Sequence, residues 1–221
     1  MNSGKNFIGS TLGKKIMVAI SGLLFCFFLL FHFANNLIIF TGADNFNFLV
    51  SSLEKIKPLV RLLEVLLVII LITHITNTVL LTIKAKRSGS APKNTTGSKH
   101  STFSSRTMFF SGSILFIFIV THLSTFWYNF QITENHSSYY KIVTDSQLGF
   151  GNIFITLLYL MAMIFLGFHI KHGFSSALIT LGLSSTILGR LINKIAFLFW
   201  LVIPSGFFMI AFWFGILKGR I

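Results

Sequence analysis

The stretch IMVAISGLLFCFFLLFHFANNLIIFTGA, residues 16–43, contains no Asp, Glu, Lys or Arg. About 20 mostly apolar residues cross the hydrocarbon core of a bilayer as a helix, so this segment predicts a transmembrane helix. Its apolar stretch is too long for a cleaved signal peptide, and no Ala-x-Ala cleavage site follows it. Four further charge-free stretches occur at 65–83, 107–133, 146–170 and 195–217.

The composition also predicts a membrane protein. Hydrophobic residues make up 53% of the 221 residues and charged residues 10%, whereas a soluble domain carries about 25% charged residues. A soluble enzyme is therefore excluded. The net charge is +13, but the cations lie between apolar runs, so no nucleic-acid partner is expected. Cys26 is the single cysteine, which excludes an intrachain disulfide framework and a cysteine-built metal site.

We predict an all-α fold, an integral membrane bundle of five transmembrane helices forming one domain over residues 1–221. The second helix is expected to begin near Pro58, ahead of its charge-free stretch, with Glu64 inside it. A Ser-, Thr- and Gly-rich segment predicts a flexible cytoplasmic loop at 85–105. The sequence does not decide whether segment 43–58 forms a short surface helix. The expected helices are about 15–41, 58–84, 106–131, 148–178 and 193–217.

Loop charge predicts the orientation, because Lys and Arg favour the cytoplasmic side. With the N-terminus inside, the inner segments hold twelve of the 18 cations, and all five acids lie on or near the outer side. The opposite orientation would reverse this bias. We therefore expect a cytoplasmic N-terminus and an outer C-terminus, in the inner (cytoplasmic) membrane of the cell.

Histidines carry the functional information. His100 and His136 fall in predicted loops, where a solvated side chain is expected. Ionisable residues inside a membrane are costly and usually mark function. One isolated histidine could equally make an interhelical hydrogen bond, but four on four helices favour ligation if their depths match. Those in or at the end of apolar spans are His32, His74, His122, His169 and His172.

The depths do match in pairs. Helices one and three run outward, and His32 and His122 lie near their outer thirds. Helices two and four run inward, and His74 and His169 lie near their inner thirds. At 1.5 Å per residue, the two layers are expected to differ in height by roughly 9 Å.

Two imidazoles per layer indicate a macrocycle rather than a bare metal ion. A zinc site would want three or four protein ligands, and no carboxylate or thiolate is near. A porphyrin supplies four nitrogens and leaves two axial positions for histidine. The sequence thus predicts two b-type haems, with iron held by His32 and His122 in one layer and by His74 and His169 in the other. With both axial positions filled, the irons should carry electrons rather than bind oxygen.

These residues resemble a known family, the five-helix, two-haem (b558-type) cytochrome b membrane-anchor subunit of succinate dehydrogenase and fumarate reductase. GLLFCFFLLFHFANNL (22–37) resembles its first-helix stretch, with His32 as ligand and Asn36 four residues on. FHIKHGFSSALITLG (168–182) resembles its His-x-x-x-Gly…Gly pattern, which favours His169 over His172. His74 in LITHITN and His122 in FIVTHLSTFW match the second and third helix ligands. In the family, helices one and three hold the distal haem and helices two and four the proximal one.

The resemblance implies the partners and the reaction. A flavoprotein subunit would oxidise succinate, an iron–sulfur subunit would pass the electrons on, and this chain would deliver them to menaquinone or another quinone. As a lone chain it would be an electron-transfer and quinone-reacting subunit of a succinate:quinone oxidoreductase, with no catalytic residue of the flavin chemistry. Dihaem fumarate reductases of this family can carry Glu where this chain has Gly167, which argues against a carboxylate proton path beside the haems.

Polar residues in or near the spans provide further candidates. Glu64 is the one carboxylate expected inside a span, roughly 9 Å deep, and could protonate quinone on the outer side; pairing with Arg61 is the plainer alternative. Candidate haem propionate contacts are His172, Lys171 and Arg106. Asn36 and Asn77 are candidate quinone contacts, although interhelical hydrogen bonds explain them as well.

Two other functions remain open. Another respiratory oxidoreductase, of the hydrogenase, formate dehydrogenase or nitrate reductase type, also uses a bis-histidine cytochrome b subunit, but with a different distribution of ligands over the helices. A haem-free transporter or assembly factor would need more intramembrane polar residues than this chain has.

Overall fold

The computed structural model describes residues 7, 9–87, 98–132 and 139–218, and leaves the side chains of 98–106 outside the description. Every regular element in this part of the chain is a helix. Five helical segments are long and apolar enough to cross a membrane: 11–41, 57–87, 107–132, 153–180 and 187–217. The prediction of an all-α protein with five membrane-spanning helices is confirmed, and the chain is a multi-pass membrane protein.

The first two spans are joined by a helix. The first span is α2 (Thr11–Leu37), continued by the 3₁₀ turn η1 (Ile38–Thr41), and the second is α4 (Lys57–Arg87). Between them lies α3 (Ala43–Lys55). The sequence did not decide whether this segment forms a short helix. Gly42 has a φ of 110°, a backbone conformation that side chains disfavour, and it permits the sharp turn from η1 into α3.

The other spans contain π-helical turns. The third consists of α5 (Ser98–His122), the π-helical turn η2 (Leu123–Trp127) and α6 (Tyr128–Ile132); the short helix α7 (Tyr139–Thr144) precedes the fourth, α8 (Ile153–Thr180). The fifth consists of α9 (Ile187–Phe197), η3 (Leu198–Val202), α10 (Ile203–Phe212) and η4 (Trp213–Leu217). Such turns often occur at functional sites, and η2 begins directly after His122.

The predicted loop at 85–105 is shorter than expected. Residues 85–87 are the last turn of α4, and 98–105 are the first turns of α5, so His100 lies on a helix rather than in a loop. Composition alone did not reveal this helical turn, because Ser, Thr and Gly residues also occur in loops. The remainder of the loop, 88–97, lies outside the described residues, as does His136.

Local capping fixes the ends of α8. The Asn152 side chain accepts hydrogen bonds from the Phe154 and Ile155 amides at its start. At its end, Gly182 has a φ of 71° and the Leu183 amide donates to the Leu178 carbonyl at 2.9 Å. This left-handed glycine cap satisfies carbonyls that would otherwise lack partners, and it places the fourth histidine-bearing span at a defined height.

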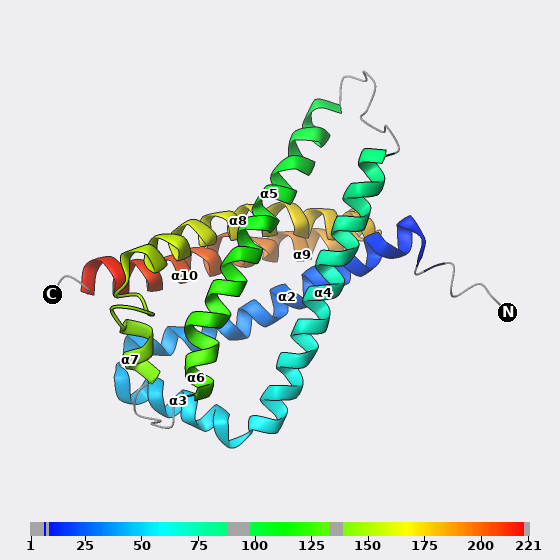
Figure 1. The fold of residues 1–221 in the computed structure, drawn as a ribbon. Helices are drawn as coiled ribbons and strands as arrows, with labels where there is room; N and C mark the ends of the chain where they lie inside the picture. Colours follow the sequence, from blue (N-terminus) through cyan, green and yellow to red (C-terminus); the bar gives the residue numbers. More distant parts are fainter. Residues whose placement is uncertain (1–6, 8, 88–97, 133–138, 219–221) are drawn as a thin grey trace.

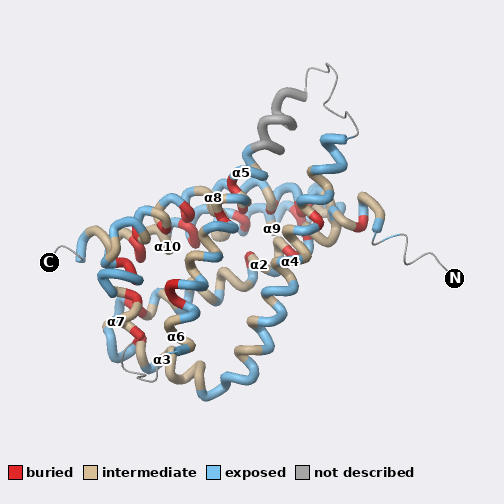
Figure 2. The backbone as a smooth tube through the Cα atoms, viewed as in Figure 1, coloured by how far each residue is buried: buried red, intermediate tan, exposed pale blue. Residues whose placement is uncertain are grey.

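The bundle has a packed body and two less enclosed helices. In Figure 1, α2, α8 and the α9–α10 span run side by side, while α4 and α5 cross them at an angle. α4 packs against α2, and α5 packs against α8. Asn77 is the one buried residue of α4, and Figure 2 shows that helix as almost wholly exposed or intermediate. Its large apolar side chains therefore face lipid.

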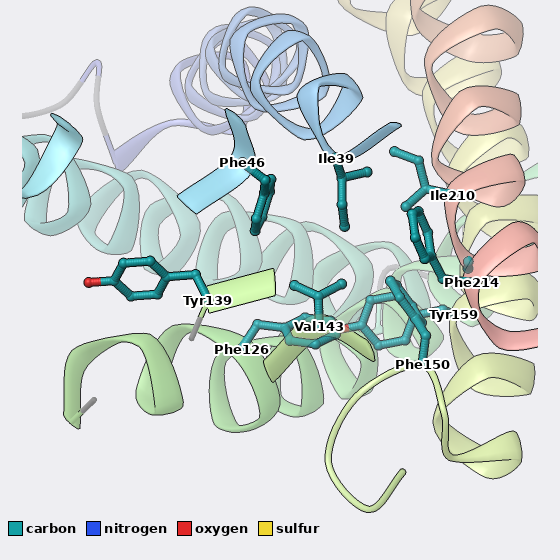
Figure 3. Close-up of a cluster of buried hydrophobic side chains, with 10 residues drawn as sticks. Ile39, Phe46, Phe126, Tyr139, Val143, Phe150, Tyr159, Ile210 and Phe214 are labelled. Atoms are coloured by element: carbon teal, nitrogen blue, oxygen red, sulfur yellow. The ribbon is translucent and has the colours of Figure 1, made fainter. Parts of the chain in front are cut away.

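Buried side chains gather at two levels. One cluster, drawn in Figure 3, lies where α3 and α7 cover the end of the bundle and includes Phe126, Phe150 and Tyr159. The other lies toward the opposite end and joins α2 to α8 and the fifth span through Cys26, Ile170 and Ala196. The histidines of interest lie on the helices that these clusters hold together.

Candidate functional site: two histidine pairs

Four histidines from four helices meet as two pairs. His32 on α2 faces His122 on α5, with ring centroids 5.8 Å apart and ring planes at 87°. His74 on α4 faces His169 on α8, with centroids 6.5 Å apart and planes at 60°. All four side chains are half-buried. These are the pairs that the depth count predicted from sequence. We refer to His32 and His122 as the outer pair and to His74 and His169 as the inner pair.

A serine of α2 fixes which nitrogen of His74 carries the proton. Ser21 Oγ lies 2.9 Å from His74 Nδ1, and the same hydroxyl donates to the Met17 carbonyl at 2.7 Å. A hydroxyl has one hydrogen to donate. When Ser21 donates it to the carbonyl, the hydroxyl accepts from Nδ1–H of His74, and in that tautomer the lone pair on Nε2 is available to a metal.

The same arrangement recurs at His169. Ser111 Oγ of α5 lies 3.2 Å from His169 Nδ1 and donates to the Met108 carbonyl at 3.1 Å. With the hydroxyl hydrogen on the carbonyl, Ser111 accepts from Nδ1–H of His169. In this tautomer both histidines of the inner pair present Nε2 as a free donor atom.

A longer chain of hydroxyls reaches His122 in the outer pair. Tyr159 Oη lies 3.1 Å from His122 Nδ1 and 3.4 Å from Thr125 Oγ1. Thr125 Oγ1 donates to the Thr121 carbonyl at 2.8 Å. A tyrosine hydroxyl that donates to Thr125 would accept from Nδ1–H of His122, and in that arrangement Nε2 of His122 is available to a metal.

His32 has a different environment. Its ring stacks on Phe28, with centroids 5.1 Å apart and planes at 19°, and lies 5.6 Å from the Phe207 ring of α10. Within the described part of the chain, no hydrogen bond to its ring is found. Aromatic packing, rather than a polar partner, therefore holds His32 in place.

Sequence reasoning missed these hydroxyls and an internal repeat that contains two of them. Ser21 and Gly22 precede His32 by eleven and ten residues, and Ser111 and Gly112 precede His122 by the same spacing. A Cβ added at Gly22 would lie 3.5 Å from His74 Cε1, and one at Gly112 would lie 3.5 Å from His169 Cε1. Each Ser-Gly step thus contacts the histidine of the following transmembrane span. The signal in the sequence is the repeated pattern Ser-Gly-x₉-His.

The repeat also measures the separation of the two pairs. Ser21 contacts the inner pair, and His32, eleven residues further along α2, belongs to the outer pair. Ser111 and His122 have the same relation on α5. Eleven residues of helix rise by about 16 Å, nearly twice the separation expected from sequence. The expectation was too small because it measured each depth from an assumed helix end.

The donor set fits an iron porphyrin. Among the described residues, no group of three or more His, Cys, Asp or Glu side chains could hold a bare metal ion. Two imidazoles that bind one metal from opposite sides through bonds of about 2 Å have ring centroids about 6 Å apart, which agrees with 5.8 and 6.5 Å. The outer-sphere oxygens on Nδ1 are typical of histidines that ligate metals.

Two of the candidate propionate contacts, Lys171 and His172, lie on α8, and the third, Arg106, lies on α5. His172 is three residues from His169 and shares its side of the helix. Lys171 is two residues from His169, and its ammonium lies 4.6 Å from the centre of the Trp200 ring on the fifth span. The side chain of Arg106 lies outside the description, although its backbone belongs to α5. His172 is therefore better placed than Lys171 to approach the inner pair.

Glu64 is paired near the N-terminal end of α4. Its Oε2 accepts from Arg61 Nη1 at 2.5 Å, and its Oε1 accepts from Trp127 Nε1 at 2.9 Å. Arg61 also donates to Gln131 and lies 5.4 Å from the centre of the Trp127 ring. This cluster, Arg61, Glu64, Trp127 and Gln131, joins α4 to η2 and α6. The ion pair is the plainer alternative that the sequence analysis had left open.

Asn77 does not join Glu64 in one site. Asn36 Nδ2 donates to the His32 carbonyl at 2.8 Å, and Asn77 Nδ2 donates to the Thr73 carbonyl at 2.9 Å. These bonds lie within single helices, not between helices. Asn77 is thirteen residues from Glu64 on α4, or about 20 Å along the axis, so it lies at the level of the inner pair.

Comparisons of the chain with protein-family models, with curated protein sequences and with solved structures found no match.

Proposed function

We propose that this chain is the dihaem cytochrome b subunit that anchors succinate dehydrogenase or fumarate reductase to the cytoplasmic membrane. It passes electrons between an iron–sulfur subunit and menaquinone or another quinone. The observation that carries the proposal is the meeting of four histidines as two cross-helix pairs with centroids 5.8 and 6.5 Å apart. Two bound iron porphyrins would supply one-electron chemistry at two levels of the membrane.

The chain's own residues hold and insulate those two levels. Imidazole Nε2 atoms would hold the two irons, and two histidines on each iron would leave no position for oxygen. Phe28, Phe207 and the aromatic cluster around Tyr159 surround the outer pair with apolar rings. Ionisable groups in this setting face the bundle interior, as expected for functional residues of membrane spans.

The succinate or fumarate assignment rests on the distribution of the ligands. One histidine on each of the first four spans resembles the b558-type anchor subunit, whereas the cytochrome b subunits of hydrogenases, formate dehydrogenases and nitrate reductases distribute their ligands differently. Flavoprotein and iron–sulfur subunits are therefore the proposed partners. Purification of the chain from its native membrane, with the copurified subunits identified by mass, separates the two assignments.

Absorbance spectroscopy tests the haem sites. In reduced-minus-oxidised spectra, His32→Ala or His122→Ala should remove one of two b-type components, and His74→Ala or His169→Ala the other. His136→Ala, a histidine predicted to lie in a loop, is the matched control and should retain both. A wild-type protein without a haem spectrum would contradict the proposal. Loss of both components from every single variant, at unchanged helicity, would contradict the two-site arrangement.

A quinone site near the outer pair is part of the proposal. Glu64 has side-chain partners on α4 and η2, in Arg61 and Trp127, and its side chain remains 27% exposed. Quinone reduction consumes two protons, so a carboxylate within reach of water and near an electron donor is the group expected to transfer them. Arg61 holds the carboxylate in place through its ion pair.

A further inference from the structure

We propose that Ser21, Ser111 and Tyr159 are positioning residues that set how strongly the histidines donate electrons to bound iron. They act separately on the two pairs, the serines on the inner pair and the tyrosine on the outer pair. The inference rests on the proposed function, because it concerns iron held at the Nε2 atoms. None of the three hydroxyls is a ligand itself.

The first step is that each hydroxyl fixes its histidine across a helix boundary. Ser21 belongs to α2 and acts on α4, Ser111 belongs to α5 and acts on α8, and Tyr159 belongs to α8 and acts on α5. Each hydroxyl has a second acceptor within reach, and we assign its one hydrogen there, so that it accepts from Nδ1–H of the imidazole. The hydrogen bond therefore fixes both the tautomer and the ring orientation.

The second step is electronic. An imidazole that donates its Nδ1–H to an oxygen is a stronger base at Nε2. A stronger axial base stabilises the ferric ion more than the ferrous ion, because the ferric ion carries the greater positive charge. The hydroxyls therefore lower the midpoint potential of the iron whose ligand they contact. Removal of a hydroxyl should raise that potential.

The third step is the difference between the pairs. Both histidines of the inner pair have a serine partner, at 2.9 and 3.2 Å. In the outer pair His122 has Tyr159 at 3.1 Å, while His32 lies between the rings of Phe28 and Phe207. The inner iron should thus respond to two independent substitutions, and the outer iron to Tyr159 alone among these three residues.

A redox titration of the purified full chain, followed by absorbance, tests the electronic step. Ser21→Ala and Ser111→Ala should each raise the midpoint potential of the inner component alone, and the double variant should show the sum. Tyr159→Phe should raise that of the outer component alone. We expect each substitution to shift the Fe(III)/Fe(II) equilibrium by up to about tenfold, which is 59 mV for a one-electron couple.

Ser113→Ala is the matched control for Ser111→Ala. Ser113 lies two residues away on the same helix, is exposed, and donates only to its own helix, to the Phe109 carbonyl at 3.0 Å. It should leave both potentials unchanged. The inference is overturned if the control shifts the potentials as much as Ser111→Ala does. It is also overturned if the serine variants shift both components together or neither.

Nuclear magnetic resonance of the full chain without haem tests the positioning step independently. With ¹⁵N-labelled histidine, His74, His169 and His122 should have the chemical shifts of imidazoles protonated on Nδ1. Ser111→Ala should alter the shifts of His169 and leave those of His74 unchanged. Protonation of these rings on Nε2 overturns the inference. A chain with Nδ1 protonation that binds no haem overturns the proposed function instead, so the two failures are distinguishable.

Discussion

At the scale of single residues, polar side chains in the spans are paired with one another or with their own helix. Ser21 and Ser111 each serve a backbone carbonyl and an imidazole at once. In the described residues, no buried side-chain nitrogen or oxygen lacks a hydrogen-bond partner. Because an unpaired polar group in hydrocarbon is costly, substitution at such positions should act on its partner as well.

Glu64→Gln tests the quinone role at this scale. Glutamine keeps the shape and can still accept from Trp127, but it cannot transfer a proton as a carboxylate does. Quinone-coupled turnover should fall at least about tenfold, while the reduced-minus-oxidised spectrum stays unchanged. Glu54→Gln, at a carboxylate of the neighbouring helix α3, provides the comparison. Equal turnover in wild type and Glu64→Gln would contradict the role in quinone protonation and leave Glu64 only a structural role in its ion pair with Arg61.

At the scale of elements, close approach of helices depends on small residues. A Cβ added at Gly206 of α10 would overlap the ring of Phe33 on α2. The fifth span has no histidine ligand, and this contact holds it against the helix that carries His32. Small residues at such crossings are typical of membrane bundles, because packing rather than the hydrophobic effect drives association there.

Gly206→Ala should therefore loosen α10 from α2. We expect a loss of about 1–3 kcal/mol in the free energy of unfolding, the usual range for overpacking, measured by denaturation in detergent. The neighbouring exposed residue gives the control, because Ser205→Ala adds no atom at the interface and should change stability by less than about 0.5 kcal/mol. Equal stability of the two variants would show that Phe33 moves aside without cost.

The stability of the turn that precedes α8 should depend on pH. The amides of Leu148 and Gln147 donate to Asp145 Oδ1 at 2.7 and 2.8 Å, and these bonds lower the pKa of Asp145 below its ordinary value of 3.8. The folded state thus favours the charged carboxylate. Its stabilising effect is fully present above pH 3.8 and is lost as the pH falls through the lowered pKa.

Asp145→Asn measures that effect. Wild type should melt at a higher temperature than Asp145→Asn. This difference should be largest at pH 6 and should vanish as the pH falls well below 3.8. The corresponding difference in the free energy of unfolding should stay below about 1 kcal/mol, because solvent screens this exposed group. A difference that grows as the pH falls has the wrong sign and would contradict the assignment.

At the scale of the whole molecule, charge is distributed unevenly along the chain. The inner segments predicted from sequence hold twelve of the 18 cations, which favours a cytoplasmic N-terminus. Under that orientation α3 lies outside, and the turn between α8 and α9 lies inside. Both carry exposed positions that a chemical probe can reach, Asn45 and Ser185.

Cysteine labelling tests the orientation. In a Cys26→Ala background, Asn45→Cys should react with a membrane-impermeant maleimide added to intact cells. Ser185→Cys should react only after the membrane is permeabilised. The reverse pattern would place the N-terminus outside. Because Cys26 is the single cysteine and is buried, background labelling should be low.

The spans and the histidine pairing could be predicted from sequence because both follow from long-range regularities. Charge-free stretches mark the helices, and alternating helix direction sorts His32 with His122 and His74 with His169. The hydroxyl partners could not be predicted in this way, since Ser21 in an apolar helix is satisfied equally well by its own carbonyls. The π-helical turns and the joining of α4 to η2 by Glu64 and Trp127 depend on side-chain packing between spans, which has no short pattern.

The nearly unburied state of α4 has a consequence for assembly. A span whose one buried residue is Asn77 packs mainly on α2 among the long helices and turns its other side chains to lipid. Partition into lipid therefore drives its insertion, and the contact with α2 fixes its place. We expect α2, α8 and the fifth span to associate first during biogenesis, and the second span to join them last.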